Sequence, residues 1–132
     1  MTNYLIDTHT LLWMRFDEEK LSDKVRGIVE NRKNKLFVSV ATLWEITIKY
    51  SLDKIILPDK PDVYLSNVLF EDDLQILPIS PIHALRLYTI PQLHRDPFDR
   101  MLIIQSIIDR LPLITKDEAI QRYHKFSLKT VW

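Results

Sequence analysis

Short hydrophobic runs alternate with helical segments along most of this 132-residue chain. Strands are expected over residues 3–6, 36–40, 74–79 and 112–115, with an edge strand over 126–131. The spacing of apolar residues predicts helices over 8–16, 23–31, 41–51, 62–71, 80–88, 96–109 and 117–123. Such alternation is typical of a parallel sheet covered by helices on both faces. The sequence therefore predicts an α/β fold.

Length and composition exclude several classes of protein. The chain has room for one domain over residues 1–132, and its 18 basic and 18 acidic side chains give no net charge for bulk nucleic-acid binding. The absence of cysteine excludes disulfides and thiolate chemistry. No secretion signal and no apolar run of about 20 residues is present, so we expect a cytoplasmic protein with no membrane contact.

Gly27 is the only glycine in the chain. Loops that enclose phosphate groups need several glycines, because the backbone N–H groups must close around the anion. The sequence therefore excludes a P-loop and a dinucleotide-binding fingerprint.

Four acidic residues stand where predicted strands or helices begin or end, namely Asp7, Glu45, Asp99 and Asp117. Right-handed crossovers place the carboxyl ends of parallel strands at one rim, where ligands bind. Two carboxylates about 5 Å apart repel by about 3 kcal/mol at an effective dielectric constant of about 20, so a cluster of them needs a cation. Oxygen ligands favour Mg²⁺ or Mn²⁺, whereas zinc favours histidine or cysteine.

Most of these acids also have a purely structural explanation as helix caps. Asp7, Asp96 and Asp117 each precede a predicted helix, where a carboxylate accepts backbone N–H groups. Glu45 follows Thr42 at the spacing of a capping box. Each cap is reasonable alone, but together they would put acids at every place where a parallel sheet gathers its strand ends. We therefore favour a metal site.

Asp99 lies three positions after Asp96, so both carboxylates face the same side of the first helical turn. Which of the two is the closer metal ligand is left open by the sequence. Among the histidines, His9 and His94 are candidates for contacts with the acids or the substrate, whereas His83 and His124 are expected at the surface.

Four segments in register resemble the PIN domain family, and more narrowly the VapC-like toxins of bacterial type II toxin–antitoxin systems. They are residues 4–13 (YLIDTHTLLW), 39–46 (SVATLWEI), 94–103 (HRDPFDRMLI) and 113–117 (LITKD). The resemblance implies a three-layer α/β/α sandwich with a central, mostly parallel sheet. It also implies a Mg²⁺- or Mn²⁺-dependent endoribonuclease that is inhibited by a small antitoxin.

The resemblance assigns catalytic roles to Asp7, Glu45, Asp99, Asp117 and Asp96. All but Asp96 are expected to hold the metal, with Asp7 and Asp99 closest to the ion. Because the acids repel RNA, cationic and polar neighbours are expected to bind the substrate. The candidates are Arg95, Arg100, Lys116, Thr115 and His9.

The expected partners are the RNA substrate, the cognate antitoxin and a second copy of the chain. Leu11, Leu12, Trp13, Ile46 and Ile55 have two alternative roles, as a surface for these partners or as core residues. An aspartyl-phosphate phosphatase would need an acid at the position of His9, so that class is rejected. The remaining alternative is a non-catalytic RNA- or protein-binding module on the same fold, whose acids serve only as caps and bind no divalent ion.

Overall fold

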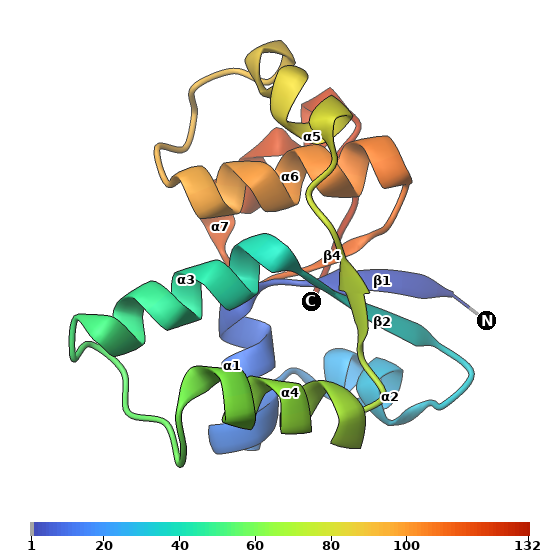
Figure 1. Cartoon of the computed structure of the whole chain (residues 1–132). Coiled ribbons are helices and arrows are strands. Elements are labelled where there is room, and N and C mark those ends of the chain that lie inside the picture. The colour runs from blue at the N-terminus through green and yellow to red at the C-terminus, as the bar shows by residue number, and fades with distance from the viewer. Residues whose placement is uncertain (1) are drawn as a thin grey trace.

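The computed structural model describes residues 2–132, which form a five-stranded, fully parallel sheet in the order β3-β2-β1-β4-β5 (Figure 1). The strands are β1 (Asn3–Ile6), β2 (Lys35–Ser39), β3 (Gln75–Leu77), β4 (Leu113–Ile114) and β5 (Thr130–Val131). The helices are α1 (Thr8–Phe16), α2 (Asp23–Glu30), α3 (Val40–Ser51), α4 (Pro61–Glu71), α5 (Pro81–Leu85), α6 (Pro97–Asp109) and α7 (Glu118–Gln121). Short 3-10 turns are η1 (Glu18–Lys20), η2 (Leu87–Thr89) and η3 (Arg122–Phe126).

Each face of the sheet carries its own hydrophobic core. Successive residues of β1 separate to the two faces, since Leu5 belongs to the core under α6 and α7 and Ile6 to the core under α1, α2 and α4. Leu113 and Ile114 of β4 divide in the same way. Figure 1 shows the resulting layers, with α5, α6 and α7 on one side of the sheet and α1, α2 and α4 on the other. The predicted three-layer α/β/α fold is confirmed.

β1 lies at the centre of the sheet, and the strand order reverses there. The chain first adds β2 and β3 on one side of β1 and later adds β4 and β5 on the other. In open parallel sheets, such a reversal leaves a crevice outside the carboxyl ends of the central strands. Asp7 directly follows β1 at this position.

Several predicted elements have different bounds in the structure. The helix expected over 80–88 is divided into α5 and η2, and the one over 117–123 into α7 and η3. β3 ends before Pro78, which has no N–H to extend a ladder. α3 begins at Val40 because the hydroxyl of Ser39 accepts the N–H of Ala41 at 3.0 Å. Glu45 is therefore in the second turn of α3 and forms no capping box with Thr42.

His83 is buried, contrary to the expectation that it lies at the surface, and only 2% of it is exposed. Its Nδ1 accepts the N–H of Ser80 at 3.0 Å, and its Nε2 lies 2.9 Å from Asp109 Oδ2 on α6. The imidazole thus joins the start of α5 to the end of α6, which explains its burial. His124 is exposed, as predicted.

The five apolar residues with two alternative roles belong to the core. Leu11 and Ile46 are buried, and Leu12, Trp13 and Ile55 pack against the same cluster. Packing against this one cluster thus accounts for all five positions. Within residues 2–132, no helix has the length and apolar character that crossing a lipid bilayer requires.

Candidate metal centre

Asp7 lies at the carboxyl end of β1 and also caps α1. Its Oδ1 accepts the N–H of Thr10 at 2.8 Å, and only 3% of the residue is exposed. Burial raises the pKa of Asp7 above its ordinary value, against the opposing effect of hydrogen bonds from Thr10 and Thr115. A buried carboxylate of this kind is unfavourable as a free anion and becomes favourable beside a cation.

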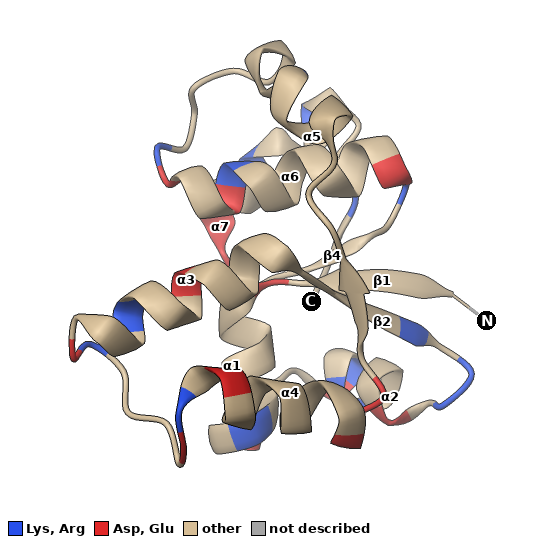
Figure 2. Cartoon of the chain, in the orientation of Figure 1, with Lys and Arg blue, Asp and Glu red and all other residues tan. Residues whose placement is uncertain are grey.

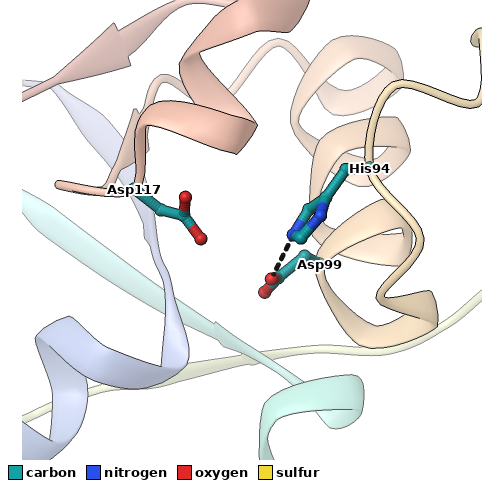
Figure 3. A group of neighbouring side chains, drawn as sticks. All are labelled: His94, Asp99 and Asp117. Atoms are coloured by element: carbon teal, nitrogen blue, oxygen red, sulfur yellow. Dashed lines mark hydrogen bonds and ion pairs between the residues drawn. The ribbon is translucent and has the colours of Figure 1, made fainter.

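Asp99, Asp117 and His94 meet on the rim beside it, where one ligand atom from each lies within 4.8 Å of the others. Asp99 is in the first turn of α6, Asp117 precedes α7, and His94 is in the loop before α6. His94 Nε2 is 2.7 Å from Asp99 Oδ2, and the Asp117 carboxylate faces this pair without a bond to it (Figure 3). Within residues 2–132, this is the only such group of three potential metal ligands.

The environment of Asp99 disfavours its charge. Burial raises its pKa to about 6, with a smaller increase from the negative charges of Asp96 and Glu45, while the hydrogen bond from His94 acts in the opposite direction. These effects place Glu45 in the electrostatic field of Asp99, although Glu45 is outside the close group. In Figure 2, acidic segments of α3, α6 and the start of α7 surround the same space.

Glu45 is held by two neighbours. Thr8 donates its hydroxyl to Glu45 Oε1 at 2.7 Å, and Lys49 Nζ lies 3.0 Å from Oε2. Glu45 is 6% exposed, and the hydroxyl of Thr8 also lies 3.1 Å from that of Thr42. The carboxylate is therefore fixed between α1 and α3, with a lysine balancing its charge.

Asp96 and Asp117 are helix caps, as the structural explanation predicts. Asp96 Oδ1 accepts the N–H groups of Phe98 and Asp99, at 2.9 and 3.1 Å, and Asp117 Oδ1 accepts the N–H of Ala119 at 2.8 Å. Asp117 is nevertheless in the group with His94, whereas Asp96 is not. The structure thus brings Asp99, and not Asp96, to the shared space.

Two predicted RNA contacts lie in the interior. Arg100 is 7% exposed, and its guanidinium donates to backbone carbonyls of the 87–91 segment. Thr115 is fully buried, and its hydroxyl accepts the N–H of Asp117 at 3.1 Å. Neither side chain can reach a phosphate, which removes both from the candidate RNA contacts. His9, Arg95 and Lys116 are exposed beside the acids.

The contacts of Thr8, Lys49 and Tyr123 with the site were not predicted from the sequence. Lys49 follows Glu45 by four positions, and this spacing of opposite charges on a helix was a usable signal. Thr8 donates to Glu45, and Tyr123 accepts the backbone N–H of His94. Both pairs join segments that are far apart in the chain, so the sequence offers no local pattern for them.

The donor set fits a divalent cation. Two carboxylates and an imidazole converge, and burial raises the pKa of one of these carboxyls, Asp99, and of Asp7 beside them. Asp99, Asp117, Asp7 and Glu45 offer oxygen atoms of the kind that Mg²⁺ and Mn²⁺ prefer.

Without metal, Asp99→Asn is expected to stabilise the protein at neutral pH by on the order of 3 kcal/mol, because the pKa of Asp99 rises from 3.8 to about 6 on folding. At a pH below the pKa that Asp99 has in the unfolded chain, its carboxyl is protonated in both the folded and the unfolded protein. Its contribution to the stability of the fold is then fully present. That contribution is lost as the pH rises through the folded pKa. The amide oxygen still accepts a hydrogen bond from His94.

Urea denaturation in EDTA at about pH 4 and at about pH 7.5 measures the effect. The difference between the variant and the wild type should grow from near zero to its full size between these values. A variant less stable than the wild type at the higher pH would contradict the burial argument.

Residues 4–125 match the PIN domain family, so the chain belongs to that family, as its resemblance predicted. Among solved structures, the chain is similar to a chain of VapBC2 from Rickettsia felis bound to a promoter DNA fragment, with a TM-score of 0.71, 14% identity and 98% of each chain covered. It is also similar to a chain of DNA-bound VapBC from Salmonella typhimurium, with a TM-score of 0.60, 18% identity and coverage of 99% of this chain and 98% of the other. No curated protein sequence matches this chain.

Proposed function

We propose that this protein is a divalent-metal-dependent endoribonuclease and the toxin of a type II toxin–antitoxin pair. The observation that carries the proposal is the convergence of Asp99, Asp117 and His94 within 4.8 Å, at the rim where Asp7 ends the central strand. Membership of the PIN domain family supports nuclease activity. The likeness to VapBC chains supports the toxin role.

Asp7, Asp99, Glu45 and Asp117 are the residues proposed to hold Mg²⁺ or Mn²⁺. When bound, such an ion would polarise a phosphodiester and favour its attack by water. The protein fixes its carboxylates beforehand, since Thr10 holds Asp7 and Thr8 holds Glu45. Asp96 supports the site by capping α6, which places Asp99 in the first turn.

RNA must approach this acidic rim, so nearby cations have to offset the repulsion between phosphates and carboxylates. Arg95 and Lys116 are exposed and adjacent in sequence to Asp96 and Asp117. His9 is exposed in the first turn of α1, two positions after Asp7. We propose these three side chains as the substrate contacts of the rim.

The proposed protein partners are a small cognate antitoxin and a second copy of this chain, both acting in the cytoplasm. The proposal of an antitoxin partner is supported by the likeness to chains of VapBC complexes. A short reading frame beside the gene, whose product binds this chain and blocks cleavage, would support it. Light scattering of the purified protein would test the homodimer.

Mn²⁺ is expected to bind the protein and, at about 100 times its Kd, to stabilise the fold by about 2.7 kcal/mol. Titration calorimetry and thermal unfolding measure both effects, and Asp99→Asn should lose both. Cleavage of labelled RNA should then require the metal and stop in EDTA.

The competing hypothesis, a non-catalytic binding module, has one observation in its favour, because Asp7, Asp96 and Asp117 do cap helices. Caps do not explain Asp99, which accepts no backbone N–H in its own helix and faces Asp117. That hypothesis predicts no Mn²⁺ binding. A wild-type protein that neither binds Mn²⁺ nor cleaves RNA would overturn the nuclease proposal.

A further inference from the structure

Two buried side chains, Arg100 and Tyr123, hold the loop that carries His94. Arg100 Nη1 donates to the carbonyl of Pro91 at 2.9 Å, and Nη2 donates to the carbonyls of Leu87 and Ile90 at 3.2 and 3.4 Å. A guanidinium presents its donors in a rigid planar fork, so these bonds fix the backbone from η2 to Pro91 relative to α6.

The hydroxyl of Tyr123 closes the same loop at its other end. Tyr123 Oη donates to the carbonyl of Pro91 at 2.7 Å and accepts the backbone N–H of His94 at 2.9 Å. It also accepts Arg100 Nη1 at 3.2 Å. One donor and two acceptor positions are all that a phenol has, so this hydroxyl is saturated. It sets the position of the His94 backbone relative to Pro91.

The imidazole of His94 then returns to α6, where its Nε2 lies 2.7 Å from Asp99 Oδ2. Asp99 and Arg100 are consecutive residues, and consecutive side chains on a helix point about 100° apart. Asp99 therefore faces the rim while Arg100 faces the interior, where only 7% of it is exposed. The loop from Pro91 to His94 is thus fixed to α6 at both ends.

We propose that Tyr123 and Arg100 are positioning residues for the carboxylate of Asp99. They fix the backbone of His94, and the imidazole of His94 in turn orients Asp99 toward Asp117. The inference rests on the proposed function, because Asp99 matters only as a ligand of the metal. Partners that orient a ligand typically change metal affinity by about 10–100-fold when they are removed.

A double-mutant cycle on Mn²⁺ affinity tests the inference. Tyr123→Phe keeps the buried ring and removes the hydroxyl, and His94→Ala removes the imidazole. By calorimetry below the unfolding temperature of every variant, Tyr123→Phe is expected to weaken Mn²⁺ binding about 10-fold, and His94→Ala by about 10–100-fold. The double variant should bind no more weakly than His94→Ala alone, because Tyr123 acts through His94.

Tyr88→Phe is the matched control. It removes a hydroxyl from a tyrosine that is 84% exposed on η2, and its Mn²⁺ affinity should equal that of the wild type. Arg100→Lys keeps the positive charge but removes the planar fork of donors. If Tyr123→Phe does not fold, Arg100→Lys replaces it in the double-mutant cycle with His94→Ala.

Wild-type affinity in Tyr123→Phe, or losses that multiply in the double variant, would overturn the positioning role. A purely structural role would lower the unfolding temperature and leave the Mn²⁺ affinity of the folded protein unchanged. Absence of Mn²⁺ binding in the wild type would instead overturn the proposed function, so the two failures are distinct.

Discussion

Asp7→Asn is expected to lower RNA cleavage by at least about 10³-fold while the protein remains folded, because metal ions supply several kcal/mol of transition-state stabilisation. Asp7 is the acid at the carboxyl end of the central strand, where the strand order reverses. The amide of asparagine still accepts the N–H of Thr10 and caps α1, but it carries no charge for a cation. Single-turnover cleavage of labelled RNA in Mn²⁺ measures the loss.

The stability of Asp7→Asn separates a catalytic from a structural effect. Burial raises the pKa of Asp7, so the neutral amide should unfold in EDTA at the same temperature as the wild type or higher. Asp73→Asn is the matched control. Asp73 is exposed before β3, at the opposite rim, and its φ of 51° is one that asparagine adopts readily. Undiminished metal-dependent cleavage by Asp7→Asn would reject its role.

Arg100→Ala is expected to destabilise the protein by about 3–5 kcal/mol, a large part of the 5–15 kcal/mol typical of a folded domain. The substitution leaves a buried cavity and removes the donors of the carbonyls of Leu87 and Ile90. Urea denaturation followed by circular dichroism measures the change. Arg95→Ala, at an exposed position nearby, should change the stability by less than about 0.5 kcal/mol.

Arg100 could bind RNA only if the interior opened. If Arg100→Ala had wild-type stability and bound RNA more weakly, the RNA contact predicted for Arg100 from the sequence would therefore be supported after all. Loss of stability, with unchanged RNA affinity of the folded fraction when both proteins are measured in EDTA, is the result that the structure predicts.

The sequence revealed the strands and the acids because both depend on local patterns. Leu5 and Ile6 form a short apolar run that fits a strand buried on both faces, and Asp7 ends it. The convergence of Asp99 and Asp117 followed from one rule, that parallel strands present their carboxyl ends at the same rim.

The direction in which each side chain points could not be predicted from the sequence. The pair Asp99–Arg100 contains two charged residues, and nothing local shows that one faces the rim and the other the core. The start of α3 also depended on competition between caps, since both Ser39 and Thr42 are good N-cap residues and the structure uses Ser39.

Contacts between distant segments were equally hidden. Tyr123 reaches the backbone of His94 across 29 positions of the chain, and Thr8 reaches Glu45 across 37. His83 was expected at the surface because its partner Asp109 lies 26 positions away. Such pairs form only when the layers pack together.

The central place of β1 has a consequence for synthesis on the ribosome. β1 pairs with β2 and with β4, and β4 is synthesised more than a hundred residues after β1. Asp7 and Asp117 are likewise separated by more than a hundred residues, so the carboxylates of the site are completed only after most of this segment has been synthesised. A chain that has been synthesised only as far as α6 therefore lacks one of the carboxylates proposed to hold the metal.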